Sequence, residues 1–220
     1  QEYRDAAYNA AAESITLLKN KNSLLPLSSD RSILIIGPAA NSLNCLNGAW
    51  THTWQGLDES YNNNYPTIKG AIEQRFNKVS YFEGSKMIMK DGDEVDVVSS
   101  DLQVAVNNAK YSDVAIVCLG ELPSTERPGD ISTLDLPNEQ QLIIKELSKV
   151  GIPIILVLVE GRPKIIREIE PLSDAILQAY LPGDQGASAI VDVLCGDINP
   201  SGKLPYTYPR YNGVIMHYDY

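Results

Sequence analysis

Four ionisable residues crowd the segment that directly follows an apolar run at residues 113–120. They are Glu121, Glu126, Arg127 and Asp130. Two carboxyl groups that face each other, one of them protonated, can form an acid/base site. The other interpretation is a salt-bridged surface loop, because Glu and Arg are common in exposed connections. Spacing alone favours the surface loop. The choice between the two interpretations therefore depends on the secondary-structure elements that position these side chains.

A second loop carries the only two tryptophans of the chain. Trp50 and Trp54 lie four residues apart in the polar segment that follows Gly37. A loop tryptophan is often anchored in a core or an interface. Alternatively, the two rings form a carbohydrate clamp, with polar edges for sugar hydroxyls supplied by the side chains of Asn44, His52 and Gln55.

Two further loops follow apolar runs. Arg162, in VEGRP, could bind a substrate carboxylate or phosphate, but we favour a role in holding neighbouring loops. Asp184, in LPGDQG, lies in a tight turn before a helix. No glycine-rich phosphate loop follows any apolar run, which disfavours a nucleotide-binding domain.

Apolar runs alternate with amphipathic segments along the chain. The patterns predict helices at 2–19, 67–76, 101–111, 138–150, 162–170 and 186–196, strands at 32–37, 78–84, 113–120, 153–161 and 175–181, and a loop at 87–96. Uninterrupted Ile, Val and Leu runs indicate strands covered on both faces. The fold class is therefore α/β, with a mostly parallel sheet between helices. In such sheets the loops at the carboxyl ends of strands bind ligands, and here those loops follow Gly37, Gly120, Glu160 and Leu181.

Composition excludes several classes of protein. The chain has 220 residues and a formal net charge of -10. No Lys/Arg cluster is present, which argues against a nucleic-acid partner. No apolar run approaches the roughly 20 residues of a membrane span. Cys45, Cys118 and Cys195 lack metal-ligand spacing and are interpreted as buried small hydrophobes, so we expect no metal. The chain begins within a helical pattern and without Met, as a fragment or processed chain would.

Beyond these patterns, an ordered set of blocks carries a resemblance to a known family. The blocks include IIGPAAN, GAWTHTWQG, GELPSTERPGD, LPNEQQ, VEGRP and AYLPGDQGASAIVDVLCGDINPSGKLPYTYP. From about Ala11 to Tyr208 the chain resembles the second domain of family 3 glycoside hydrolases, with the β-glucosidases and β-glucan exohydrolases most similar. The resemblance implies a six-stranded α/β sandwich, assigned to residues 1–208, followed by a tail at 209–220. The (β/α)8 barrel that normally precedes this domain is absent from the chain.

The same resemblance implies roles for individual residues. Glu126 matches the general acid/base of the family, with Glu121 as the runner-up, and Trp50 and Trp54 match the pair that sandwiches the sugar on the leaving-group side. The catalytic nucleophile is an Asp of the missing barrel. Some members take their acid/base from a barrel His and lack this loop, and the presence of Glu126 and both tryptophans argues against that branch.

The activity implied is retaining, exo-acting hydrolysis of β-linked gluco-oligosaccharides or aryl and alkyl β-glucosides from the non-reducing end. No cofactor is implied. The partners are the substrate and a barrel domain, in the same precursor or as a separate chain, and we expect the isolated chain to be inactive. Two alternatives stay open: a non-catalytic carbohydrate-binding or interface module, and a β-xylosidase. The family expectation for location is secreted or periplasmic.

Overall fold

The computed structural model describes residues 1–57, 64–90 and 93–215. Its helices and strands, in chain order, are α1 (Glu2–Ser14), β1 (Thr16–Asn20), η1 (Lys21–Ser23), β2 (Ser32–Ile36), α2 (Ile68–Arg75), β3 (Lys78–Phe82), β4 (Ser85–Lys90), β5 (Asp93–Val98), α3 (Leu102–Ala109), β6 (Val114–Gly120), η3 (Arg127–Gly129), α4 (Asn138–Ser148), β7 (Ile154–Val159), β8 (Ala175–Gln178) and α5 (Gly186–Cys195). None of the helices in these ranges has the length and apolar character needed to cross a membrane.

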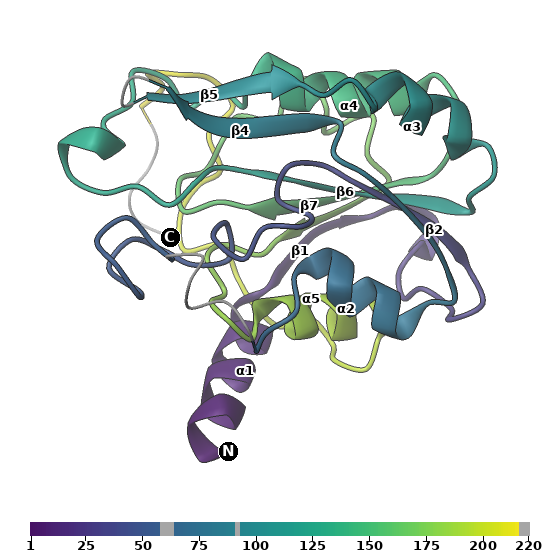
Figure 1. Cartoon of the computed structure of the whole chain (residues 1–220), viewed down its shortest axis with the longest axis horizontal. Helices are drawn as coiled ribbons and strands as arrows, with labels where there is room; N and C mark the ends of the chain where they lie inside the picture. Colours follow the sequence, from purple (N-terminus) through teal and green to yellow (C-terminus); the bar gives the residue numbers. More distant parts are fainter. Residues whose placement is uncertain (58–63, 91–92, 216–220) are drawn as a thin grey trace.

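Six strands form one sheet in the order β1-β8-β7-β6-β2-β3. All neighbours in this sheet are parallel except β1, which runs antiparallel to β8. The predicted α/β class, the six-stranded mostly parallel sheet and the helices on both faces are confirmed. In Figure 1 helices α1, α2 and α5 lie below the sheet, and α3, α4 and the β4–β5 hairpin lie above it.

The central strands are apolar throughout because both of their faces are buried. In β6, Ile116 and Cys118 pack with the layer of α1, α2 and α5, whereas Val117 and Leu119 pack with the layer of α3 and α4. All four side chains are fully buried. Burial of each large aliphatic side chain is worth roughly 1.5–3 kcal/mol, so these strands form a rigid base for the loops at their ends.

Helix α5 shows how local sequence fixes an element. Its buried residues include Ile190, Val193 and Leu194, which repeat at helical spacing on one face. The helix ends at Cys195, and Gly196 follows in the left-handed conformation with φ 80°. A side chain at Gly196 would also meet Pro26, whose Cβ would lie 2.7 Å from the added Cβ.

Two predicted elements on the β1 side of the sheet need correction. The helix predicted at 2–19 ends at Ser14, and Thr16–Asn20 forms edge strand β1 against β8. The hydrophobic spacing around Leu17 and Leu18 fits a helix equally well, but the open edge of β8 offers hydrogen bonds that a helix cannot use. Strand β8 is also shorter than the predicted 175–181.

Two other predictions were wrong in kind. The loop predicted at 87–96 is instead most of an antiparallel hairpin formed by β4 and β5, with Met87 opposite Asp96. The sequence at 91–92 is Asp-Gly, a strong hairpin signal, and these two residues lie outside the described ranges. The helix predicted at 162–170 does not form, and the segment runs instead as turns with a single bridge between Ile165 and Asp135.

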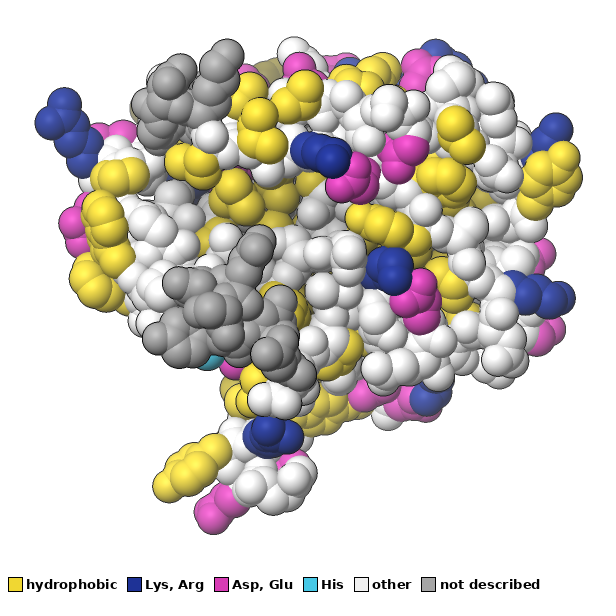
Figure 2. Space-filling model, in the orientation of Figure 1, with side chains coloured by type: hydrophobic (Ala, Val, Ile, Leu, Met, Phe, Trp, Pro, Cys, Tyr) yellow, Lys and Arg dark blue, Asp and Glu magenta, His cyan; other side chains and the backbone are white. Residues whose placement is uncertain are grey.

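The β4–β5 hairpin is partly apolar on its outer side. Side chains of Ile88, Val95 and Val97 are each more than a third exposed. Hydrophobic side chains are visible in the corresponding upper region of Figure 2, whereas Lys and Arg are scattered over the visible face. On its other side the hairpin packs against α4 and reaches the loop that follows β6.

Candidate active site

Two loops at the carboxyl edge of the sheet carry the predicted site residues and contact each other. The Glu126 loop (residues 121–130) follows β6, and the Trp loop (residues 48–57) belongs to the connection after β2. Arg162 follows β7, the strand beside β6. Loops that follow three neighbouring strands, β2, β6 and β7, therefore meet at one edge of the sheet, and the contacts between them define the site.

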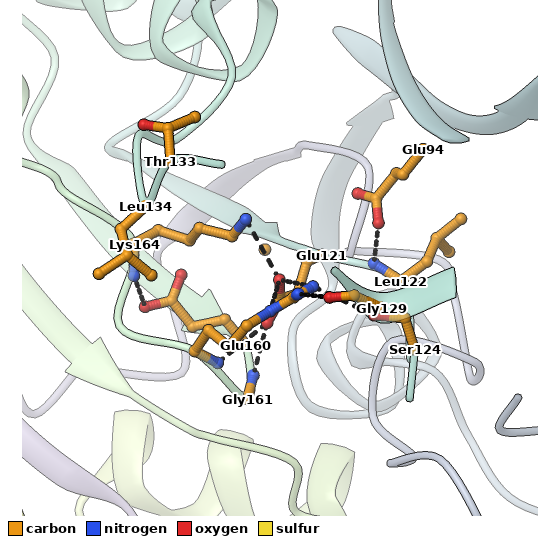
Figure 3. Close-up of polar contacts among 12 residues, drawn as sticks. Glu94, Glu121, Leu122, Ser124, Gly129, Thr133, Leu134, Glu160, Gly161 and Lys164 are labelled. Atoms are coloured by element: carbon orange, nitrogen blue, oxygen red, sulfur yellow. Dashed lines mark hydrogen bonds and ion pairs between the residues drawn. The ribbon is translucent and has the colours of Figure 1, made fainter. Parts of the chain in front are cut away.

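Glu121 is a buried anchor at the start of the Glu126 loop. Its Oε1 accepts hydrogen bonds from the backbone N–H groups of Gly161 (3.1 Å) and Arg162 (2.9 Å), and its Oε2 faces Arg162 Nη2 (2.6 Å) and Lys164 Nζ (3.2 Å). Figure 3 shows these contacts converging on one carboxylate. Burial by itself would raise the pKa of Glu121, but hydrogen bonds from Arg162 and the charges of Lys164 and Arg162 outweigh it, so the pKa lies below its ordinary value. Glu121 is thus held as a carboxylate.

Arg162 ties the far end of the same loop to this anchor. Its Nη1 donates to the carbonyl oxygen of Gly129 (2.6 Å), and its Nη2 donates to Ser124 Oγ (3.1 Å). A planar guanidinium with five donors suits this role, because it serves several acceptors at once. The favoured interpretation, that Arg162 holds neighbouring loops, is confirmed, although Pro163 begins no helix.

Two supporting residues were missed by sequence reasoning. Glu94 on β5 accepts a hydrogen bond from the backbone N–H of Leu122 (3.1 Å), and burial raises the pKa of Glu94 to about 7. The side-chain amide of Gln140 on α4 bonds both the N–H (2.9 Å) and the carbonyl oxygen (2.8 Å) of Gly120. Glu94 went unnoticed because the hairpin that carries it was predicted as a loop.

Glu160 forms a second buried carboxyl group, at the end of β7. Its Oε1 accepts hydrogen bonds from the Lys164 N–H (3.1 Å) and the Tyr208 hydroxyl (3.0 Å), and the residue is fully buried. Its Oε2 and the Oε1 of Gln178 are buried without a hydrogen-bond partner among the described residues. Burial raises the pKa of Glu160 to about 8. Protonation of Glu160 would give its carboxyl group an O–H donor. In the ionised form, Glu160 Oε2 and Gln178 Oε1 are both acceptors without a donor.

Glu126 differs from the buried glutamates Glu94, Glu121 and Glu160. It is exposed, and within the described ranges no hydrogen bond or ion pair engages its side chain. Its backbone has φ 57° and ψ -150°, a conformation that residues with a side chain rarely adopt. The contacts of Glu121 and Arg162 hold the two ends of the Glu126 loop, and this loop conformation leaves the Glu126 carboxyl unengaged at the surface of the site.

Trp50 and Trp54 also present their rings to solvent. Their side chains are 68% and 44% exposed, which excludes an anchor in the core of this domain. The backbone N–H of Trp50 donates to the backbone carbonyl oxygen of Trp54 (3.2 Å), and this hydrogen bond closes a short turn between the two residues. Two exposed indole rings fit either a carbohydrate clamp or an interface.

The three polar side chains expected as edges for sugar hydroxyls are engaged within the protein. Asn44 Oδ1 accepts a hydrogen bond from a backbone N–H of the Trp loop (3.0 Å). His52 Nε2 lies 3.2 Å from both carboxylate oxygens of Asp184. Gln55 contacts the Glu126 loop through its amide. These residues hold the Trp loop in place.

A hollow of about 270 Å³ lies between the two loops. Its lining includes Ala49, Pro123, Glu126, Arg162 and Leu181. Within the described ranges, no three His, Cys, Asp or Glu side chains gather where they could hold a metal ion. The arrangement thus presents one unengaged carboxyl group at a concave surface and two exposed aromatic rings on the adjoining Trp loop. Such groups suit proton transfer to a ligand that has flat apolar faces.

Two other aspartates lie away from this edge. Asp113 precedes β6 and accepts hydrogen bonds from the N–H and hydroxyl of Ser32 (both 2.7 Å). Asp174 precedes β8 and accepts one from the Ile154 N–H (3.0 Å). Both sit at the amino ends of strands, so neither lies with the loops at the carboxyl edge of the sheet.

Comparisons with known proteins agree with this architecture. Residues 15–220 match the family described as "Glycosyl hydrolase family 3 C-terminal domain". A lysosomal β-glucosidase of Dictyostelium discoideum is 40% identical over 218 residues, covering 96% of this chain and 26% of that protein. A β-xylosidase of Formosa agariphila is 31% identical over 97% of this chain and 29% of its own length.

A solved structure extends the match to three dimensions. A mutant β-glucosidase from Listeria innocua in complex with laminaribiose superposes with a TM-score of 0.82 at 29% identity, covering 97% of this chain and 28% of the other. The chain therefore belongs to glycoside hydrolase family 3, as its C-terminal α/β domain. It spans about a quarter to a third of the length of these relatives.

Proposed function

We propose that this chain is the acid/base-bearing domain of a retaining, exo-acting β-glucosidase. The observation that carries the proposal is the contrast between Glu126 and Glu121. Glu121 is buried, paired with cations and held ionised, so it is poorly suited to donate a proton. Glu126 lies on the same loop, exposed and unengaged, at the lining of the hollow.

In this mechanism an Asp on a barrel domain attacks the anomeric carbon of the substrate. Glu126 donates a proton to the departing glycosidic oxygen, and the same group then deprotonates the water that releases glucose. Retention places the two carboxyl groups roughly 5 Å apart, so the barrel has to cover the hollow closely. Trp50 and Trp54 stack the sugar of the leaving group through their exposed faces.

The relatives support a glucosidase ahead of a xylosidase. The Dictyostelium β-glucosidase is 40% identical to this chain, whereas the Formosa β-xylosidase is 31% identical. A β-xylosidase is the second candidate because both activities occur among the relatives. Comparison of kcat/KM for aryl β-glucosides and aryl β-xylosides, with the barrel domain present, separates the two.

The test of the acid/base role uses the leaving group. In the enzyme that contains this chain and a barrel, Glu126→Gln should lower kcat/KM on cellobiose by roughly 10²–10⁴-fold, since that oxygen leaves poorly without a proton. An aryl glucoside with a strongly activated leaving group should keep most of its kcat/KM. Glu73→Gln on the surface of α2 provides a matched control with unchanged kinetics. Equal losses on both substrates, or none, would refute the proposal.

A further inference from the structure

Gln55 joins the Trp loop to the Glu126 loop. Its side-chain Oε1 accepts a hydrogen bond from the Thr125 N–H (3.0 Å), and its Nε2 donates to the Thr125 carbonyl oxygen (3.3 Å). One amide therefore satisfies both backbone polar groups of the residue directly before Glu126. A paired contact of this kind fixes direction as well as distance, because both ends of the amide are engaged.

The two loops also touch through apolar atoms beside this contact. Gly56 has φ 102°, and a Cβ added there would lie 2.4 Å from Pro123 Cγ. Leu57, the next residue, donates its N–H to Asn44 Oδ1 (3.0 Å). The Trp loop thus packs against the Glu126 loop at Gly56, and its backbone is fixed by the hydrogen bond to Asn44. Both contacts restrict the backbone that carries Gln55.

The backbone of Glu126 needs such a support. Its φ of 57° and ψ of -150° cost roughly 1–3 kcal/mol and persist only where the surroundings enforce them. On the carboxyl side, Arg162 holds the Gly129 carbonyl oxygen. On the amino-terminal side of Glu126, the side-chain amide of Gln55 holds the N–H and the carbonyl oxygen of Thr125.

We propose that Gln55 is a positioning residue, which directs the Glu126 carboxyl by fixing Thr125 and couples it to the tryptophans of the Trp loop. A sugar stacked on Trp50 and Trp54 then stiffens the loop that carries the proton donor. This inference rests on the proposed function, because it assigns to Gln55 an effect on proton transfer by Glu126.

The test measures how kcat/KM depends on the leaving group in the enzyme with its barrel. The probes are aryl β-glucosides whose phenols span a range of pKa values. Gln55→Met removes both hydrogen bonds at similar size, and Gln55→Glu keeps the accepting oxygen and loses the donor. Gln103→Met and Gln103→Glu repeat the same changes on the exposed side of α3.

With Gln55→Met, kcat/KM should fall roughly 10- to 100-fold for the least activated substrates and little for the most activated ones. Its plot of log kcat/KM against leaving-group pKa should therefore be steeper than that of the wild type, and the Gln103 variants should match the wild type. The slope for Gln55→Glu should lie between those of the wild type and Gln55→Met. If Gln55→Met does not fold, the test uses Gln55→Glu alone.

A parallel plot, lowered uniformly or unchanged, would overturn the role of Gln55. The Glu126→Gln enzyme separates this failure from that of the proposed function. If Glu126→Gln steepens the plot and both folded Gln55 variants do not, only the positioning role is wrong. If Glu126→Gln leaves the plot unchanged, the acid/base assignment itself fails.

Discussion

Glu121 and Arg162 meet through both the backbone and the side chain of the arginine. The Arg162 N–H donates to Glu121 Oε1 at 2.9 Å, while its Nε lies 2.9 Å from Oε2. The carboxylate that leads the Glu126 loop is thereby tied to the strand end next to it. A charged residue at this buried position serves to shape the loop, and the shape of the loop exposes Glu126.

Loss of the charge at position 121 should destabilise the domain strongly. Glu121→Gln leaves Arg162 and Lys164 without their buried counter-charge, which typically costs about 3–5 kcal/mol. Urea unfolding of wild type and variant at pH 7 measures the difference in the free energy of unfolding. Glu73→Gln, which breaks an exposed ion pair on α2, should cost less than about 1 kcal/mol.

The same difference should depend on pH with a defined sign. The pKa of Glu121 in the folded protein lies below its ordinary value of 4.5. Its ionised form therefore contributes stability that is present above about pH 4.5 and is lost as pH falls through the lower, folded-state pKa. The gap between wild type and Glu121→Gln should narrow below pH 4.5. A gap that widens there would contradict this electrostatic account.

Glu160 should have the opposite dependence on pH. Burial raises its pKa from 4.5 to about 8. Between these values the folded protein keeps a proton that the unfolded chain has released, so stability falls as pH rises from about 4.5 to 8. Glu160→Gln should lower the slope by on the order of 1.4 kcal/mol per pH unit within the window, and the slope from other buried carboxyl groups such as Glu94 should remain. Urea unfolding across this range, with Glu73→Gln as control, checks it, and parallel slopes for all three proteins would contradict it.

The strained backbone at Glu126 predicts an unusual order of stability. Glycine normally destabilises relative to alanine by about 0.4–1 kcal/mol, because it has more freedom when unfolded. At φ 57° and ψ -150° the alanine keeps the strain and the glycine relieves it. Glu126→Gly should therefore be more stable than Glu126→Ala by about 1 kcal/mol in urea unfolding. An alanine variant more stable than the glycine variant by about 0.4–1 kcal/mol would show that the backbone is not strained.

Much of the sheet could be predicted from sequence because its strands are buried on both faces. Runs such as 113–120 and 153–161 have an unambiguous apolar pattern, and the structure places both in the centre of the sheet. The edges were harder, because Thr16–Asn20 carries a pattern that also suits a helix. Its strand conformation is decided by pairing with β8, which lies far away in the sequence.

The candidate site could be predicted only at the level of its exposed groups. Glu126, Trp50 and Trp54 stand out by residue type and family pattern, whereas their supports do not. Gln140 is a polar residue on a buried helix face, where an apolar residue is usual. This exception in the helical pattern was the signal in the sequence that could have identified it as a supporting residue. Glu94 gave none, since its role depends on the pairing of two strands.

The most direct measurement is the configuration of the product that a Glu126→Ala enzyme forms with azide and an activated aryl β-glucoside. A retaining enzyme passes through an α-linked glucosyl-enzyme, and without the acid/base a small anion takes the place of water. If Glu126 is the acid/base, azide should restore turnover and the product should be β-glucosyl azide, identified by NMR. An α-glucosyl azide, or turnover that azide does not change, would contradict the assignment of Glu126.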